Sequence, residues 1–218
     1  KKGIIVKGKT ANGVLNGYQT LLQICSAKEV KKGTIPFVKI EDYPRFDWRG
    51  MMLDCSRQFF DKPTVKNYID WLAAHKMNIF HWHLVDDQGW RIQLKKHPKL
   101  TNMASDGLFY TQEEIKAIVK YADERGILVI PEIDVPGHAT AILTAYPEIG
   151  SKVVNSNANS LENKTQTSTV ASYSLERNSG IFTPTLDPSN PRTYELLSEI
   201  FDEVCPLFSG RYFHIGGD

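Results

Sequence analysis

Residues 111–138 read TQEEIKAIVKYADERGILVIPEIDVPGH. Thr111 and Glu114 have the spacing of a capping box, and apolar residues then recur every three or four positions until a glycine ends the pattern. This pattern predicts a helix over residues 111–125. Residues 127–133 are nearly all apolar, which is typical of a strand covered on both faces. A helix followed at once by a buried strand is the repeating unit of an α/β fold with parallel strands.

The same alternation continues on both sides of this unit. The further predicted elements are strands at residues 51–55, 78–83 and 211–215, a helix at 61–75, and a helix that Asn190 begins. The apolar positions that we expect on the buried face of the last helix are Tyr194, Leu197, Phe201 and Val204.

Polar residues follow the end of every predicted strand, where barrel enzymes carry their chemistry. A (β/α)8 TIM barrel takes about 250 residues, whereas residues 41–218 offer only four strands. We therefore predict an α/β chain that is the first half of a (β/α)8 barrel, truncated after the fourth strand. The alternative is a complete, open four-stranded α/β domain.

Two segments, residues 1–40 and 151–180, do not continue this alternation of strands and helices. Residues 1–40 contain an apolar run at residues 4–6, which we expect to be a strand, and a helical pattern at residues 17–25. We interpret them as the C-terminal part of a small, non-catalytic α+β domain. Residues 151–180 hold 15 Ser, Thr or Asn residues, so we expect a long polar excursion there.

Composition narrows the class of protein. The chain has 218 residues, 41% of them hydrophobic and 23% charged, which excludes disordered, collagen-like and coiled-coil proteins. A net charge of +1 provides no drive toward nucleic acid or membrane surfaces. No apolar run approaches the roughly 20 residues of a membrane span. The cysteines Cys25, Cys55 and Cys205 form neither a disulfide framework nor a zinc motif.

Common catalytic and nucleotide-binding motifs are missing as well. The sequence has no G-x-S-x-G elbow, no phosphate-cradling glycine loop and no dinucleotide fingerprint. Serine-nucleophile, kinase and Rossmann functions are therefore unsupported.

The first two clusters at strand ends leave alternatives open. Arg57 could offer its fork of donors to hydroxyls or a carboxylate, or could form a structural ion pair with Asp54. His81 and His83 point to one face of their strand, since side chains alternate. The two imidazoles could hold a metal together with an acid, orient a sugar or a catalytic group, or be satisfied core residues. The segment from Asp86 onward places tryptophan beside acids and amides, which is typical of carbohydrate pockets.

The other two clusters follow the third and fourth strands. In residues 131–138, two acids alternate with apolar residues before a Pro-Gly turn presents His138. A buried Asp–His pair would let this imidazole carry a charge, although His138 could instead cap the next helix. In residues 214–218, two glycines allow a close backbone approach that would deliver Asp218 into a pocket.

Together the four clusters resemble one family. Residues 49–57, 78–91, 131–138 and 214–218 are similar, in order, to motifs of the β-N-acetylhexosaminidases of glycoside hydrolase family 20. Residues 13–23 resemble the end of the α/β domain that precedes the barrel in that family. The resemblance implies a TIM-barrel hydrolase that removes terminal β-linked N-acetylglucosamine or N-acetylgalactosamine and needs no metal or cofactor.

The resemblance also implies roles for individual residues. In this family the substrate's 2-acetamido oxygen attacks the anomeric carbon, and the configuration is retained without an enzyme nucleophile, an exception among glycosidases. Asp218 matches the residue that orients the acetamido group, and Arg57 matches the one that binds the hydroxyls at C3 and C4. Asp86 and His138 match a supporting pair that tunes the general acid, with Asp87 as a candidate for further support behind them.

One departure from the family pattern concerns the acid. The family motif continues Gly-Gly-Asp-Glu, whereas this sequence stops at Asp218, so the general acid is absent and we expect little catalysis from these residues alone. The expected partner is a carbohydrate rather than nucleic acid or membrane, and such substrates favour an exported protein. Two rival functions are a metal-dependent hydrolase using His81, His83 and an acid, and a glycan-binding relative without catalysis.

Overall fold

The computed structural model describes residues 3–27, 35, 37–151 and 172–218. The helices and strands, in chain order, are α1 (Ala11–Ser26), β1 (Gly50–Asp54), α2 (Lys62–Ala74), β2 (Ile79–Asp86), β3 (Gly89–Trp90), α3 (Pro98–Ala104), α4 (Gln112–Asp123), β4 (Leu128–Val135), α5 (Thr140–Ala145), the short 3-10 helix η2 (Pro147–Ile149), α6 (Pro191–Val204), the 3-10 helix η3 (Cys205–Leu207) and β5 (His214–Gly216).

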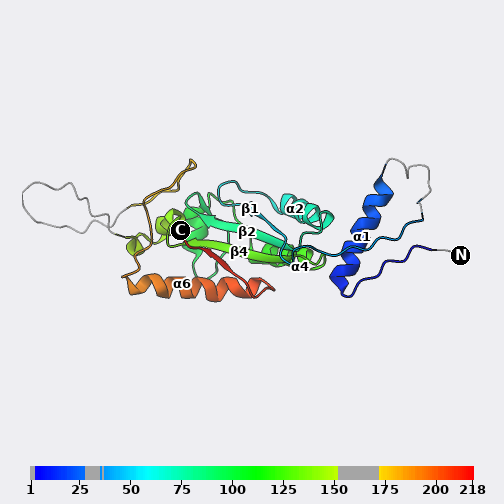
Figure 1. Cartoon of the computed structure of the whole chain (residues 1–218). Helices are drawn as coiled ribbons and strands as arrows, with labels where there is room; N and C mark the ends of the chain where they lie inside the picture. The colour runs from blue at the N-terminus through cyan, green and yellow to red at the C-terminus, as the bar shows by residue number, and fades with distance from the viewer. Residues whose placement is uncertain (1–2, 28–34, 36, 152–171) are drawn as a thin grey trace, which may run out of the picture.

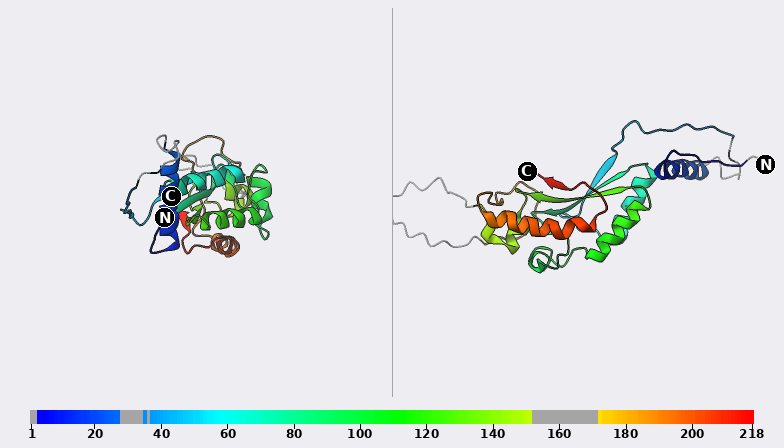
Figure 2. Two further views of the ribbon diagram at one scale, coloured as in Figure 1. Left: turned by 90° about the vertical axis from the view of Figure 1, so that its right-hand side faces the viewer. Right: turned by 90° about the horizontal axis from the view of Figure 1, so that it is seen from below.

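The sheet has the parallel topology that the sequence predicts. Strands β1, β2, β4 and β5 lie side by side in that order and pair in parallel, while β3 forms a short antiparallel hairpin with β2. Helices α4 and α6 pack on one face of the sheet, and no described helix covers the other face (Figures 1 and 2). Consecutive parallel strands with their helices on one side are the arrangement of neighbouring units in a (β/α)8 barrel.

Local sequence signals explain where the main helices begin. Asp61 caps α2, and Asn190 caps α6 through its side-chain oxygen. At α4 the Thr111 hydroxyl accepts a hydrogen bond from the Glu114 N–H at 3.2 Å, and the Glu114 carboxylate accepts one from the Thr111 N–H at 3.1 Å. The predicted capping box is therefore confirmed, and each cap satisfies backbone donors that have no partner within the helix.

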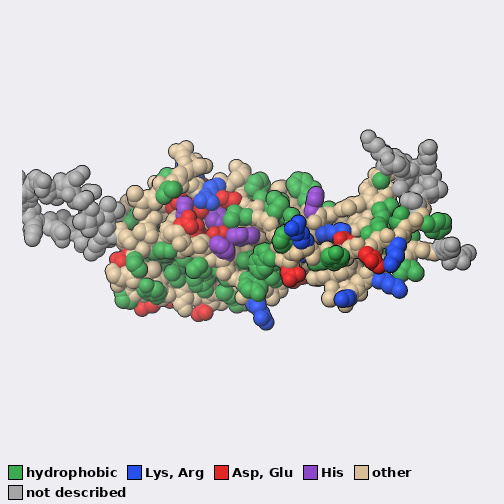
Figure 3. Space-filling model, in the orientation of Figure 1, with side chains coloured by type: hydrophobic (Ala, Val, Ile, Leu, Met, Phe, Trp, Pro, Cys, Tyr) green, Lys and Arg blue, Asp and Glu red, His purple; other side chains and the backbone are tan. Residues whose placement is uncertain are grey.

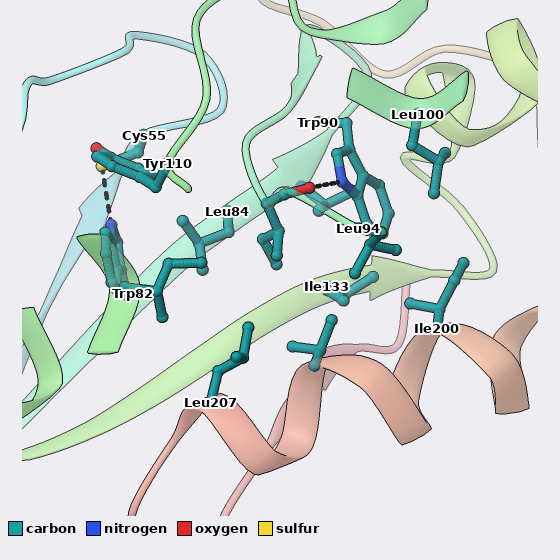
Figure 4. Close-up of a cluster of buried hydrophobic side chains, with 14 of the residues drawn as sticks. Cys55, Trp82, Leu84, Trp90, Leu94, Leu100, Tyr110, Ile133, Ile200 and Leu207 are labelled. Atoms are coloured by element: carbon teal, nitrogen blue, oxygen red, sulfur yellow. Dashed lines mark hydrogen bonds between the residues drawn. The ribbon is translucent and has the colours of Figure 1, made fainter. Parts of the chain in front are cut away.

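The hydrophobic core fills the space between the sheet and its helices (Figure 4). Its largest fully buried side chains include Trp82, Trp90 and Tyr110. Both indoles have a hydrogen-bond partner, since Trp82 Nε1 donates to Cys55 Sγ at 3.2 Å and Trp90 Nε1 donates to the Ile92 carbonyl. All three cysteines are free.

The structure corrects the predicted buried face of α6. Its buried residues are Thr193, Leu196, Ile200 and Val204. Of the four expected positions, Val204 is buried, Leu197 and Phe201 are half-buried against the core, and Tyr194 is 60% exposed. Apolar residues occupy two adjacent stripes of this helix, and only contact with the sheet selects one of them.

The amino-terminal predictions also need correction. Residues 4–6 form no strand; Ile4 and Ile5 are 62% and 76% exposed, and they pair with no described strand. Helix α1 begins at Ala11, six residues before the predicted start. A groove of about 770 Å³ is lined by residues of α1, of segments 3–7 and 37–49 and of the end of α2, and none of the predicted site residues lines it.

Five short elements escaped prediction, namely α3, β3, α5 and the 3-10 helices η2 and η3. Strand β2 runs on to Asp86, three residues beyond its predicted end, whereas β5 covers only the three residues His214–Gly216. Most of the predicted polar excursion at residues 151–180 lies outside the described residues. None of the helices in the described ranges is long and apolar enough to cross a membrane.

Candidate active site

Polar side chains gather at the carboxyl ends of the parallel strands. Figure 3 shows histidines, acids and an Arg or Lys side chain together on the face that the helices leave uncovered, close to the C-terminus. The five residues that the sequence singled out as catalytic, substrate-binding or supporting all meet here, namely Arg57, Asp86, Asp87, His138 and Asp218. They come from segments that lie up to 161 positions apart in the chain.

Arg57 lies in the turn that follows β1. Asp54 accepts the backbone N–H groups of Ser56 and Arg57 at 3.0 Å each, which shapes this turn. The guanidinium then reaches Asp54 Oδ2 at 2.8 Å and Asp86 Oδ2 at 2.7 Å. Burial lowers the pKa of Arg57, but the two carboxylates outweigh burial and raise it. The structural ion pair is therefore present, and the side chain remains 37% exposed.

Asp86 is the junction of the cluster. Its carboxylate is completely buried. Oδ2 lies 2.7 Å from an Arg57 nitrogen and 2.8 Å from His83 Nε2, while Oδ1 accepts the Asp87 backbone N–H at 2.7 Å and lies 3.1 Å from His138 Nδ1. Each oxygen thus has two partners, so the orientation of this carboxylate is tightly defined.

Asp87 anchors the segment that carries His138. Its Oδ1 accepts the backbone N–H of Thr140 at 3.0 Å and the Thr140 hydroxyl at 2.5 Å, at the start of α5. Its Oδ2 lies 2.9 Å from His138 Nδ1. His138 has a φ of 48°, a left-handed conformation that costs a non-glycine residue energy and that these contacts maintain. The alternative that His138 caps helix α5 is wrong. Asp87, and not His138, accepts the backbone N–H of Thr140 at the start of that helix.

The environment of His138 favours its charged form. Burial lowers the pKa of His138, but the charges of Asp86 and Asp87 outweigh burial and raise it. On the opposite side of the ring, Nε2 lies 3.3 Å from Asp218 Oδ2. An imidazolium at this position connects the buried acids to Asp218, whose side chain is 68% exposed.

Two glycines bring Asp218 to this position. Gly216 has a φ of 66° and Gly217 a φ of 101°, values that favour glycine. The Gly217 N–H donates to Asp134 Oδ1 at 3.3 Å, and the Gly137 N–H donates to the carbonyl of Asp218 at 3.0 Å. Burial raises the pKa of Asp134, and the nearby charge of Asp218 raises it further.

The two histidines of β2 have separate partners. His83 Nε2 faces Asp86, whereas His81 Nε2 lies 2.5 Å from Glu132 Oε2. His81, Glu132 and His214 have possible ligand atoms within 4.8 Å of one another. His83 belongs to no such group among the described residues, because its two ring nitrogens face Asp86 and Glu132. The structure therefore does not place His81 and His83 around one metal position, as the rival metal-dependent hydrolase would require.

Four residues of the site were not among the predicted site residues, namely Asp54, His83, Glu132 and Asp134. The first three lie inside predicted strands, and Asp134 directly follows one. The signal that could have marked them as site residues was a polar side chain within or beside an apolar run. Their partners, however, lie mostly on neighbouring strands, so the sequence alone could not pair them.

Comparison with known proteins identifies the family. A model of the glycosyl hydrolase family 20 catalytic domain matches residues 46–218. The β-hexosaminidase of Porphyromonas gingivalis is 40% identical in a match covering 100% of this chain and 28% of the relative. The chitobiase of Flavobacterium johnsoniae, a crystal structure, is 58% identical with a TM-score of 0.77 over 94% of this chain and 28% of its own.

A third relative was solved with a sugar bound. The exo-β-N-acetylglucosaminidase of Vibrio harveyi, in complex with N-acetylglucosamine, is 33% identical with a TM-score of 0.70, covering 94% of this chain and 33% of its own. The chain thus spans about a third or less of the length of these relatives. The family match over residues 46–218 and the shared parallel fold establish that this chain belongs to glycosyl hydrolase family 20.

Proposed function

We propose that this chain forms the first half of the catalytic barrel of an exo-acting β-N-acetylhexosaminidase. The family membership supports this proposal, as does the sugar bound to the relative from Vibrio harveyi. Because the chain spans only part of its relatives, the activity is proposed for the protein that contains these residues together with the remaining strands. Residues 1–40 are assigned to the end of a small preceding domain.

Asp218 is proposed to orient the substrate's 2-acetamido group. Its exposed carboxylate is free to accept a hydrogen bond from the acetamido N–H, which turns the acetamido oxygen toward the anomeric carbon. That oxygen forms a bond to the anomeric carbon while the bond to the leaving oxygen breaks. Asp218 then lies beside the positive charge that develops on the cyclic intermediate and stabilises it. Water opens this intermediate and retains the β configuration.

His138 and Asp86 are proposed to support Asp218. A charged His138 attracts the Asp218 carboxylate through Nε2, at 3.3 Å, and so holds it in place as an acceptor for the acetamido N–H. Asp86 and Asp87 hold the other ring nitrogen. The orientation of Asp218 therefore depends on buried residues that never touch the sugar.

Arg57 is proposed to bind the hydroxyls at C3 and C4 of the terminal sugar. Asp54 and Asp86 hold the guanidinium in one orientation, and the side chain stays 37% exposed. A planar, fixed fork of donors suits two adjacent hydroxyls, and its rigidity reduces the entropy lost when the sugar binds.

The leaving oxygen needs a proton from a general acid. By the family motif this acid follows Asp218, so the 218 residues by themselves are expected to be inactive. The observation that carries the proposal is the chain of contacts from Asp86 through His138 to Asp218, with distances of 3.1 Å and 3.3 Å.

The test is hydrolysis of a chromogenic N-acetyl-β-glucosaminide by the protein that contains these residues and the rest of the barrel. A matched β-glucoside lacks the acetamido group, and an N-acetyl-β-galactosaminide reports the preferred epimer. We expect cleavage of the acetamido sugars alone and its collapse in Asp218→Ala. Chelation should leave the rate unchanged.

Three outcomes would contradict the proposal. Equal cleavage of the glucoside would eliminate substrate assistance. Loss of activity on chelation would favour a metal-dependent hydrolase. Binding of N-acetylglucosamine without cleavage of any sugar would favour a non-catalytic glycan-binding protein.

A further inference from the structure

A row of alternating acids and histidines crosses the sheet beneath Asp86. In the strand register, Asp54 of β1 pairs with His83 of β2, His83 pairs with Glu132 of β4, and Glu132 pairs with His214 of β5. Directly paired residues on neighbouring strands point to the same face. The four side chains therefore form one layer on the uncovered face of the sheet, below the proposed catalytic residues.

The central pair of this layer is buried. The side chains of His83 and Glu132 are 3% and 4% exposed, and His83 Nδ1 lies 2.8 Å from Glu132 Oε2 at an angle that makes no aligned hydrogen bond. On its other side, His83 Nε2 lies 2.8 Å from Asp86 Oδ2. Two buried carboxylates thus flank one buried imidazole.

Charged groups face His83 from each neighbouring strand. Asp54 of β1 attracts it, and Arg57 from the turn after β1 lies 3.3 Å from Nε2. Burial lowers the pKa of His83, but Asp86 and Glu132 outweigh burial and raise it to about 9. His83 is therefore an imidazolium at neutral pH.

The Glu132 carboxylate in this layer faces three histidines. It contacts His81 at 2.5 Å and lies 3.3 Å from His214 Nδ1 as well as close to His83. Burial raises the pKa of Glu132, but the hydrogen bond with His81 and the close contact with the charged His83 outweigh burial and hold it well below its usual range. Glu132 consequently stays ionised and keeps its charge opposite His83.

We propose that His83 and Glu132 are positioning residues for the hydrolysis proposed above: Glu132 holds His83 as a cation, and this cation fixes Asp86 between Arg57 and His138. This inference rests on the proposed function. His83 shares Asp86 Oδ2 with Arg57, so it controls the carboxylate that both contacts the sugar-binding arginine and holds the ring next to Asp218. Neither His83 nor Glu132 touches the substrate.

The test is the variant Glu132→Gln in the protein that contains the whole barrel. Glutamine keeps the size of the side chain and one accepting oxygen, and it removes the negative charge. With that charge gone, the protonated fraction of His83 at pH 8.5 should fall about tenfold or more, as followed by NMR of ¹⁵N-labelled histidines. The variant should therefore acquire an alkaline limb in kcat/KM, about a tenfold further loss between pH 6 and pH 8.5.

Two controls separate positioning from general damage. Glu132→Gln combined with His83→Gln lacks the imidazole at position 83, so the alkaline limb that Glu132→Gln acquires should be absent from it. His97→Gln removes another buried histidine, which contacts Tyr146 and Glu199 outside the site. This control should leave the pH profile and the His83 signal unchanged.

The results distinguish this inference from the proposed function. A pH-independent loss in Glu132→Gln, or an alkaline limb that persists without His83, would overturn the positioning role. An unchanged His83 titration in Glu132→Gln would overturn it without any measurement of activity. Failure of the wild-type protein to cleave acetamido sugars would instead overturn the proposed function.

Discussion

The backbone at Gly216 passes so close to Asp134 that a Cβ atom added to Gly216 would lie 1.7 Å from Asp134 Oδ1. This approach places the Gly217 N–H 3.3 Å from the same carboxylate oxygen and directs the chain toward Asp218. The absence of a side chain at position 216 therefore sets the place of the proposed orienting acid.

Replacement of Gly216 by alanine should displace Asp218. Alanine at a φ of 66° costs about 1–2 kcal/mol in backbone strain, and the contact with Asp134 adds to that. Gly107→Ala is the matched control, since Gly107 has a φ of 75° but nothing within 4 Å of an added Cβ. Urea unfolding should show a larger loss of stability for Gly216→Ala, together with loss of sugar hydrolysis. Equal losses in the two variants would contradict the role of the close approach.

Asp87→Asn should lower the pKa of His138. The asparagine side chain would keep an oxygen that can accept the Thr140 N–H, but the charge that favours the imidazolium would be lost. We expect the NMR titration midpoint of His138 to fall in this variant. Thr140→Val, which removes the hydroxyl partner of Asp87 and keeps the charge, should leave that midpoint in place. A midpoint unmoved in Asp87→Asn would show that Asp87 does not control the ring.

Stability should decline at alkaline pH because His83 is held as a cation. Its pKa is raised from 6.5 to about 9, so the stabilisation is complete below pH 6.5 and is lost as pH rises through 9. The free energy of unfolding should be greater at pH 6 than at pH 9.5, by up to about 3 kcal/mol. His83→Gln should flatten this dependence. A wild-type protein equally stable at both pH values would refute the charged state.

Stability should also decline at acidic pH, because Glu132 becomes protonated there. Because the pKa of Glu132 is lowered, its contribution is complete above its ordinary value of 4.5 and is lost as pH falls below that value. The contributions of Glu132 and His83 to the free energy of unfolding are therefore both complete between about pH 5 and 6.5. Urea unfolding at pH 3.5 should give a lower stability than at pH 6, with a smaller difference in Glu132→Gln.

Arg57→Lys should weaken sugar binding. A lysine cannot contact Asp54 and Asp86 and still present a planar fork, so we expect KM to rise about tenfold or more with a smaller change in kcat. Arg192→Lys is the control, because Arg192 of helix α6 forms its ion pairs with Glu195 and Glu199 on the surface and with none of the five site residues. A KM that stays at the wild-type value in Arg57→Lys would exclude Arg57 from sugar binding.

Several parts of the fold follow from local sequence. The capping box of Thr111 and Glu114, the cap at Asp61 and the apolar periodicity of α4 depend on residues within a few positions of one another. The buried face of α6 does not, because two apolar stripes compete there and packing against the sheet selects one. Residues 4–6 similarly have the composition of a strand, but a strand requires a partner strand.

The site residues also fall into those that the sequence identified and those that only the structure identified. Arg57, Asp86, Asp87, His138 and Asp218 were singled out from motifs, and the structure brings all five together. His83 was left with several possible roles, namely metal ligand, support for a sugar or a catalytic group, or core residue, and Glu132 was noticed only as one of two acids in its segment. Their significance depends on a register in which positions 49 residues apart lie opposite each other.

The sequence by itself determined the order of strands and helices, the helix caps and the motifs that mark the family. These properties arise from interactions between near neighbours in the chain. Only the tertiary structure decided which carboxylate faces which histidine, and hence which side chains are charged. That pairing requires parallel strands brought together from distant parts of the chain, and burial between them makes each charge depend on its partner.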